Sequence, residues 1–276
     1  MQNYSVLMSV YKKENSIYLR EAINSILKQT ILPTEIVIIK DGKLTKELED
    51  TLNYYTFNFP QLFSIYGYNE NKGLGYALNY GLKYCKNELI ARMDTDDIAH
   101  PKRCELQLKE FQRNYQLSVV GSFIQEFYTT KNKKILAGKR TVPIRDKEIK
   151  KYTKKRCPFN HMTVMFKKGD VIKSGGYKKW HFNEDYYLWI RMLESTCIFK
   201  NIPIVLVFAR IDKNMYQRRG GIKYFISEKR LQQYMLNRQI ITREQYFINV
   251  FLRFIIQVLL PSFLRKSVYD FFARKK

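Results

Sequence analysis

Three carboxylates lie within four residues of one another, where they could hold a metal ion. Asp94, Asp96 and Asp97 follow directly after a short apolar run, residues 89–93. Carboxylates this close repel one another unless a cation lies between them, and hard divalent cations prefer oxygen ligands. We therefore expect a metal-assisted site for a phosphate-bearing substrate. A solvated acidic turn explains the same residues.

The elements before these acids indicate a sheet that would position them. Apolar runs predict strands, and segments with helical periodicity lie between them, the first of which Asn15 or Ser16 can cap. Strands are expected at 5–11, 35–39, 63–68 and 89–93, and helices after Asn15 and at about 46–55 and 76–83. This alternation predicts a parallel sheet covered by helices on both faces.

Ligands of such sheets bind beyond the carboxyl ends of the strands. Asp41 follows the second strand, and the polar, glycine-bearing loop 69–75 follows the third. Both should therefore meet the three carboxylates at one sheet edge.

The second half of the sequence predicts a more varied arrangement. A helix is expected at 102–114, a strand at 119–127, and an exposed loop with a short helix in the basic stretch 131–156. Residues 157–166 have β character. The segment Asn183-Glu184-Asp185 is expected to open an amphipathic helix.

Composition narrows the possible classes of protein. The chain has 276 residues, 45% of them hydrophobic, and a formal net charge of +24, which indicates one folded domain with appendages and a negatively charged partner. Nucleic acid, anionic lipid and a phosphorylated substrate all fit that charge. The cysteines lie far apart without zinc-ligand spacing, which favours free thiols in a reducing compartment. They are Cys85, Cys104, Cys157 and Cys197. No secretory signal opens the sequence, so a cytosolic location is expected.

Eight blocks resemble, in order and spacing, glycosyltransferase family 2, the inverting nucleotide-sugar glycosyltransferases of the GT-A fold. The similarity is to bacterial members that build capsular polysaccharide, exopolysaccharide or O-antigen. The blocks are S-V-L-M-S-V-Y, E-I-V-I-I-K-D-G, N-K-G-L-G-Y-A-L-N-Y-G-L, A-R-M-D-T-D-D, N-H-M-T-V-M-F, G-G-Y, N-E-D-Y-Y-L-W-I-R-M-L and Y-Q-R-R-G-G.

The resemblance implies an α/β fold with a Rossmann-like, mostly parallel central sheet flanked by helices. It implies a glycosyltransferase domain at 1–222, with a nucleotide-sugar half at about 1–100 and an acceptor half at about 101–222.

On the donor side, the resemblance implies that Asp41 binds the base of the nucleotide; a turn-forming Asp before glycine is the alternative. Asn71, Lys72 and Gly73 resemble the loop beside the nucleotide. Lys72 could pair with a phosphate or remain a solvated loop lysine.

The resemblance also implies a metal site. Asp94 would lie nearer the ribose, and Asp96 would bind a Mn²⁺ or Mg²⁺ that bridges the donor phosphates and neutralises the departing diphosphate. Asp97 would support this pair or position donor hydroxyls. Arg218 and Arg219 resemble the basic loop that closes over the donor.

On the acceptor side, Asp185 resembles the catalytic base that takes a proton from the attacking sugar hydroxyl. Glu184, His161 and Trp180 are placed on the acceptor side. A helix N-cap pair and a core histidine are the alternatives for the acids and for His161. Two features depart from the family: Lys40 replaces an Asp of many relatives, and no Trp follows Arg219 as in processive synthases, which favours transfer of a single sugar.

Residues 223–276 predict a basic, amphipathic helical extension. Arg253, Gln257 and Pro261 interrupt its apolar run, so a membrane span of about 20 apolar residues is not available. Such a segment can lie on an anionic membrane surface, where a lipid-linked acceptor would be presented, or it can pack on the domain or a partner subunit.

We therefore expect a metal-dependent, inverting glycosyltransferase, cytoplasmic and peripheral on the inner face of the cell membrane. It would move one sugar, from a UDP-sugar on family frequency, to a saccharide acceptor that is lipid-linked, without a nucleic-acid partner. A nucleotidyltransferase and a basic nucleic-acid-binding protein are the alternatives. The sequence predicts neither the sugar, the linkage nor the oligomeric state.

Overall fold

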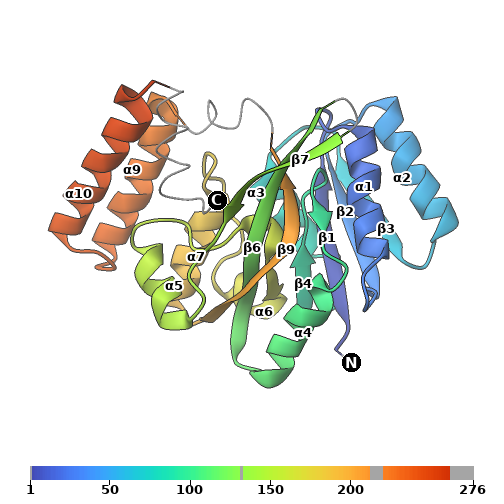
Figure 1. The fold of residues 1–276 in the computed structure, drawn as a ribbon, viewed down its shortest axis with the longest axis horizontal. Helices are drawn as coiled ribbons and strands as arrows, with labels where there is room; N and C mark the ends of the chain where they lie inside the picture. Colours follow the sequence, from blue (N-terminus) through green and yellow to red (C-terminus); the bar gives the residue numbers. More distant parts are fainter. Residues whose placement is uncertain (1, 131–132, 212–219, 262–276) are drawn as a thin grey trace.

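The computed structural model describes residues 2–130, 133–211 and 220–261. Its first half alternates strands and helices as predicted (Figure 1). These elements are β1 (Tyr4–Val10), α1 (Ser16–Leu27), β2 (Glu35–Asp41), α2 (Lys46–Asn58), β3 (Phe63–Tyr68), α3 (Leu74–Leu82) and β4 (Leu89–Arg92). Strands β3, β2, β1 and β4 are parallel neighbours, which confirms the Rossmann-like half. Asn15 caps α1 through its side-chain oxygen, as expected.

The second half continues the same sheet with mixed strand directions. It contains β5 (Ile98–Ala99), α4 (Arg103–Arg113), β6 (Leu117–Thr130), β7 (Lys133–Arg140), α5 (Asp146–Thr153), β8 (Met165–Lys167), α6 (Lys168–Lys173), α7 (Glu184–Glu194) and β9 (Ile198–Arg210). The order across the described sheet is β3-β2-β1-β4-β8-β6-β9-β5, with β7 paired to β6. The short β8 is antiparallel to both β4 and β6, whereas β6 and β9 are parallel.

Two expectations for this half were wrong. The basic stretch predicted as an exposed loop with a short helix does contain that helix, α5, but the part predicted as a loop holds β7, which pairs with the long β6. Residues 157–166 are mostly not a strand, because His161–Thr163 form a 3₁₀ turn. Both the backbone nitrogen and the hydroxyl of Thr163 donate to the carbonyl of Asn160, a local arrangement that competes with strand pairing.

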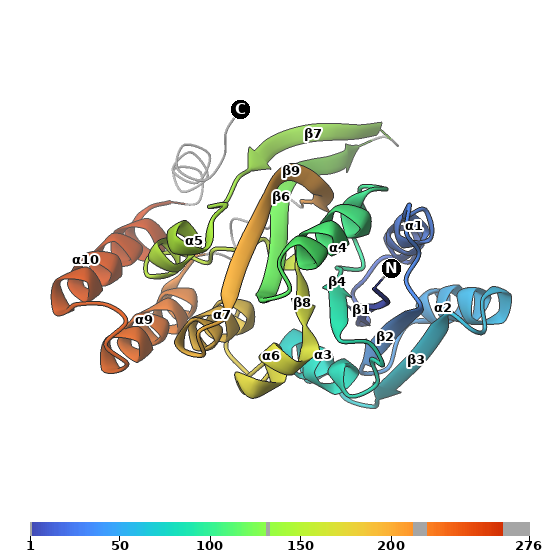
Figure 2. The same cartoon turned by 90° about the horizontal axis from the view of Figure 1, so that it is seen from below.

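Helices cover both faces of the sheet. Figure 2 shows α1, α2 and α4 on one face and α3, α6 and α7 on the other. Alternating side chains of β1 separate the two cores: Val6 and Met8 pack toward α1, whereas Leu7 packs toward α3. Helices packed on both faces of the sheet thereby fix the carboxyl ends of the parallel strands.

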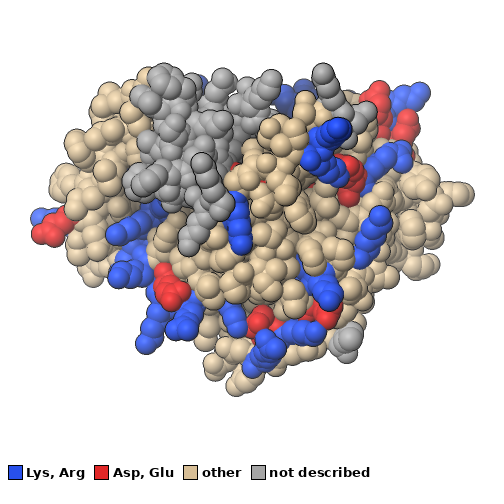
Figure 3. Space-filling model, viewed as in Figure 1, with Lys and Arg blue, Asp and Glu red and all other residues tan. Residues whose placement is uncertain are grey.

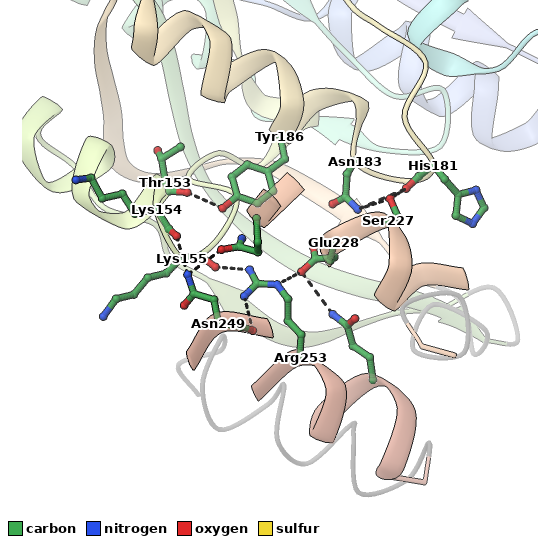
Figure 4. Close-up of polar contacts among 12 residues, drawn as sticks. Thr153, Lys154, Lys155, His181, Asn183, Tyr186, Ser227, Glu228, Asn249 and Arg253 are labelled. Atoms are coloured by element: carbon green, nitrogen blue, oxygen red, sulfur yellow. Dashed lines mark hydrogen bonds and ion pairs between the residues drawn. The ribbon is translucent and has the colours of Figure 1, made fainter. Parts of the chain in front are cut away.

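The extension begins with α9 (Ile222–Asn237) and α10 (Arg243–Phe254), followed by a π-helical turn (Ile255–Leu259). The inner face of this helix pair packs on α7 through Tyr186, Ile190, Leu231 and Met235. Polar contacts reinforce the junction (Figure 4), since Arg253 pairs with Glu228 and donates to the carbonyl of Lys155. The described part of the extension therefore packs on the domain, which was one of its two expected roles. Among the described helices, none is long and apolar enough to cross a membrane.

Gly81 tests the packing of α3 against the sheet. A Cβ atom at this position would lie 2.4 Å from Cδ1 of Leu7 and 2.9 Å from Cγ1 of Ile39. Alanine favours a helix over glycine by about 1 kcal/mol, but overpacking a core costs about 1–3 kcal/mol. We expect Gly81→Ala to lower the free energy of unfolding in urea denaturation. Lys229→Ala, on the exposed face of α9, should change it by less than about 0.5 kcal/mol. A Gly81→Ala protein as stable as the wild type would contradict this packing.

Candidate functional site

The carboxyl ends of β2 and β3 hold the first part of the predicted site. Asp41 is buried, and its carboxylate accepts four hydrogen bonds, one from the last residue of β3 and three from the loop that follows β3. Its Oδ1 accepts from the hydroxyl of Tyr68 at 2.9 Å and from the backbone nitrogen of Lys72 at 2.7 Å. Its Oδ2 accepts from Nδ2 of Asn71 and from the backbone nitrogen of Gly73, both at 3.0 Å.

These bonds use the approximately four lone-pair directions that a carboxylate offers. Asp41 therefore holds the loop that contains Asn71, Lys72 and Gly73. This brings Asp41 together with the three loop residues that were predicted to lie beside the nucleotide. Base binding by Asp41 itself stays a prediction.

Lys72 lies among aromatic rings beside Asp41. Its Nζ is 4.8 Å from the ring centroid of Tyr76 and 5.5 Å from that of Tyr68. Such cation–π contacts hold the ammonium group beside the carboxyl ends of β2 and β3. Among the described residues, no acidic side chain pairs with it and would compete with a phosphate. Phosphate pairing by Lys72 is compatible with this position.

The acidic turn follows β4, the next strand along this edge. Arg92, whose side chain is only 2% exposed, forms a bidentate pair with Asp94. Its Nη1 lies 2.7 Å from Oδ2 of Asp94, and its Nη2 pairs with Oδ1. A forked guanidinium pair of this kind fixes the direction of the carboxylate as well as its charge. Asp94 is therefore oriented before any ligand binds.

Among the described residues, no side-chain cation forms such a pair with the carboxylates of the other two acids of the turn. Burial and the charge of Asp94 raise the pKa of Asp96 to about 6. Burial, Asp96 and Asp94 together raise the pKa of Asp97 well above its usual range. Oδ1 of Asp97 accepts a hydrogen bond from the backbone nitrogen of Arg210 at 2.8 Å, whereas its Oδ2 is buried without a partner among the described residues.

This turn fits a divalent cation. Ligand oxygens of Asp94, Asp96 and Asp97 lie within 4.8 Å of one another. An ion at that position would neutralise the carboxylates that burial destabilises and could satisfy the orphaned oxygen of Asp97. Asp96 is the most available ligand, because Arg92 already occupies both oxygens of Asp94.

Helix α3 connects this edge to the second group of predicted residues. Oδ1 of Asn79 accepts a hydrogen bond from the backbone nitrogen of Tyr177 at 2.9 Å. A Cβ on Gly176, whose φ is +62°, would lie 2.4 Å from that same oxygen, so the turn requires glycine. Near the start of α3, a Cβ on Gly75 would lie 3.2 Å from Cβ of Glu184. The loop beside Asp41 and the first turn of α7 are therefore direct neighbours.

Two carboxylates open α7. Burial and the neighbouring Asp185 raise the pKa of Glu184 to about 7. Burial also raises the pKa of Asp185, while Oδ2 of Asp185 lies 3.5 Å from the thiol sulfur of Cys157. The charge of Arg92 lowers the pKa of both acids, so they lie within electrostatic range of the residue that pairs with Asp94. Carboxylates with raised pKa are suited to accepting protons near neutral pH.

Helix α9 of the extension contacts the segment at the start of α7. Asn183 directly precedes the two acids, and its side-chain nitrogen donates to the hydroxyl of Ser227 on α9 (Figure 4). The indole nitrogen of Trp180 donates to the carbonyl of Ser227, and its ring packs at a tilt against that of Tyr187. Trp180, predicted on the acceptor side, thus joins α9 to the segment before α7.

His161 lies between the two groups of acids. Its Nε2 is 3.0 Å from the hydroxyl of Tyr177, and burial together with Arg92 lowers its pKa well below the usual range. His161 is therefore neutral at physiological pH and suited to hydrogen bonding. A role in binding the acceptor stays a prediction.

Some residues of this arrangement were missed as site residues. They are Arg92, Asn79, Tyr177 and Arg210. The first three belong to sequence blocks quoted above, so their position beside glycines and acids was an available signal. Arg218 and Arg219 lie outside the described residues.

The acidic turn predicts a stabilising metal. At about 100 times its dissociation constant, Mn²⁺ should raise the free energy of unfolding by about 2.7 kcal/mol. Asp96→Asn should lose most of this gain in a thermal-denaturation assay. Without metal, the same substitution should raise the melting temperature, because burial and Asp94 disfavour the charged form of Asp96. Asp50→Asn, on the exposed side of α2, is the control. Equal stabilisation of wild type and Asp96→Asn by Mn²⁺ would place the metal elsewhere.

Comparison with known proteins places this site in a family. The sequence model described as glycosyl transferase family 2 matches residues 5–171. A UDP-Gal:alpha-D-GlcNAc-diphosphoundecaprenol beta-1,3-galactosyltransferase of Escherichia coli is 38% identical over 268 residues, covering 96% of this chain and 94% of that protein. The amylovoran biosynthesis glycosyltransferase AmsE of Erwinia amylovora is 32% identical, covering 97% and 98%.

A similar fold occurs in a solved structure. The crystal structure of S. aureus TarS in complex with UDP-GlcNAc superimposes with a TM-score of 0.69 at 14% sequence identity, covering 98% of this chain and 76% of that one. At this identity, the likeness concerns the fold. The fold and the family match agree with the resemblance seen in the sequence. The chain belongs to glycosyltransferase family 2 and is a glycosyltransferase of the GT-A fold.

Proposed function

We propose that this glycosyltransferase moves one sugar from a UDP-sugar to a lipid-linked saccharide, with inversion at the anomeric carbon and with the help of a divalent metal. The observation that carries this proposal is the contact between the two halves of the site. Gly75, beside the Asp41 loop, touches Glu184, beside Asp185. A donor held at the sheet edge would therefore present its sugar to a carboxylate of raised pKa.

The donor half would bind the nucleotide and its diphosphate. The loop around Lys72 would lie against the nucleotide, and the acidic turn would supply oxygen ligands from Asp96 and its neighbours for the metal. When bound there, Mn²⁺ or Mg²⁺ would neutralise charge on the leaving diphosphate. Arg92 fixes the direction of the Asp94 carboxylate, which would accept a hydrogen bond from a ribose hydroxyl.

The acceptor half would supply the base. A sugar hydroxyl is a weak nucleophile, so a carboxylate that removes its proton during attack lowers the barrier. Asp185 fits this role, because its raised pKa makes it a stronger base than an exposed aspartate. Its proton would come from the hydroxyl that attacks opposite the departing phosphate. Glu184 and neutral His161 would hydrogen-bond the acceptor.

Relatives support the choice of substrates. The printed name of the E. coli relative includes UDP-Gal and a diphosphoundecaprenol acceptor, and the TarS structure contains UDP-GlcNAc. The E. coli and Erwinia relatives align over 94% and 98% of their own length, which supports the same acceptor class here. We propose a role in surface polysaccharide biosynthesis on this basis.

Asp185→Asn tests the proposed reaction. Transfer from UDP-sugars to a GlcNAc-diphospho-lipid should fall at least about 100-fold, because general base catalysis is lost, while binding of UDP with Mn²⁺ should persist. Wild-type transfer should decline as pH falls through the raised pKa of Asp185, since the protonated acid cannot accept a proton.

Asp170→Asn, in the first turn of α6, is the matched control for removing an acid at a helix start. A parallel screen of UDP-, GDP- and dTDP-sugars for release of nucleoside diphosphate identifies the donor. Full activity of Asp185→Asn would remove it as the base. Release from none of these sugars by the wild type would reject the proposed donor class.

We also propose that the outer face of α10 contacts an anionic membrane. Four large apolar side chains of this helix are 50–68% exposed: Phe247, Ile248, Phe251 and Leu252. Figure 3 shows lysine and arginine side chains gathered over the neighbouring α5, whose sequence contains Lys147, Lys150 and Lys151. An apolar face beside basic groups suits a negatively charged lipid surface, and the net charge of +24 adds to that attraction.

Replacing Phe247 and Phe251 with Asp should release the protein from the membrane. We expect the wild type to sediment with vesicles that contain phosphatidylglycerol and the double variant to remain in solution, because the apolar contact is lost. Phe57→Asp, which changes an 86% exposed phenylalanine on α2, is the matched control. Equal sedimentation of both variants would contradict the proposal. A wild type that instead forms dimers lost in the double variant would assign the face to a second copy.

A further inference from the structure

Arg210 is a buried arginine at the end of β9 that contacts the acidic turn. Its side chain is only 7% exposed. The backbone nitrogen of Arg210 donates to Oδ1 of Asp97 at 2.8 Å, and its Nε donates to the backbone carbonyl of Asp96 at 3.0 Å. One residue therefore fixes the turn at two points, although 113 positions separate it from Asp97.

The rest of the guanidinium group is held by other elements. Its Nη1 donates to the hydroxyl of Thr129 on β6 at 2.6 Å, and its Nη2 pairs with Glu21 on α1. The rings of Tyr18 and Phe127 lie 3.7 Å and 4.6 Å from its Cζ. Because the donors of a guanidinium have a fixed planar arrangement, these contacts set the position of Nε as well.

Glu21 anchors this arrangement. Its second carboxylate oxygen pairs with Lys134 of β7 at 2.9 Å. Partial burial would raise the pKa of Glu21, but Lys134 and Arg210 together lower it, so the carboxylate is ionised at neutral pH. Glu21 pairs with Arg210, and Arg210 in turn contacts the acidic turn at Asp96 and Asp97.

We propose that Arg210, held in place by Glu21, is a positioning residue that sets the metal affinity of the acidic turn by fixing the backbone at Asp96. This inference rests on the proposed metal-dependent function and goes beyond it, because it assigns the control of metal affinity to residues that donate no ligand. It also links α1 and the β6–β7 hairpin to the diphosphate end of the donor site.

The sign of the effect separates positioning from charge. A positive charge beside a cation site weakens cation binding, so an arginine that acted only through its charge would lower the affinity for the metal. Removing it would then tighten metal binding. An arginine that acts by holding Asp96 has the opposite effect, and its removal weakens metal binding.

Three substitutions test this inference. Arg210→Lys keeps the charge but loses the fork, Arg210→Met loses both, and Glu21→Gln loosens the anchor while leaving Arg210 intact. Mn²⁺ is titrated into each protein at saturating UDP, and free Mn²⁺ is followed by electron paramagnetic resonance. We expect both Arg210 variants to bind Mn²⁺ about tenfold more weakly, the loss expected for a hydrogen bond in a charged group, and Glu21→Gln to shift in the same direction by less.

Glu110→Gln is the matched control. Glu110 on α4 also bridges two cations, Arg113 and Lys200, so it controls for the loss of a shared ion pair. Its Mn²⁺ affinity should equal that of the wild type. In transfer assays, the KM for the donor should rise in the Arg210 variants while the KM for the acceptor stays unchanged, which a general loss of folding would not produce.

Unchanged or tighter Mn²⁺ binding by Arg210→Lys and Glu21→Gln would overturn the inference. Glu21 is one-third exposed, so its variant keeps the test decisive if Arg210→Met fails to fold. A wild type that binds no more Mn²⁺ than a protein-free UDP solution would overturn the metal dependence in the proposed function, and the inference with it. The two failures are therefore distinguished by the wild-type titration alone.

Discussion

Repulsion among three carboxylates at the end of one buried strand is the constraint on which the rest of the site depends. Arg92 neutralises Asp94 from within β4, whereas Asp96 and Asp97 are stabilised mainly through backbone contacts. Burial makes the charges costly and also makes each remaining attraction stronger. The turn is thus stable enough to fold, yet repulsion among its carboxylates remains, and a bound cation would reduce it.

Helix α3 determines how the two halves of the site meet. Its first turn touches Glu184, its middle holds the backbone of Tyr177 through Asn79, and its end packs on β1 at Gly81. A single short helix therefore contacts the sheet edge, the histidine partner and the start of α7. Gly75 and Gly81, near the two ends of α3, permit this close approach to different partners.

Local signals explain how much of the fold could be predicted. The parallel half followed from apolar runs, Asn15 capping and glycine-bearing loops, all of which act within a few residues. Strand β7 and the turn at His161 were missed, because the pairing of β6 and the hydrogen bonds of Thr163 override local propensity. In the site, acids and loop residues were recognisable by type and spacing. The partners that orient them were not, since contacts such as that between Arg210 and Asp97 join distant parts of the chain.

The four hydrogen bonds to Asp41 have a consequence for how a nucleotide would associate. Fixing the backbone of one residue costs about 1–2 kcal/mol in conformational entropy, and here that cost is met during folding. The loop at Lys72 and Gly73 is thus preorganised, and an arriving ligand need not order it. The nucleotide should accordingly bind this loop without rearranging it, so the affinity there depends on how well the nucleotide fits.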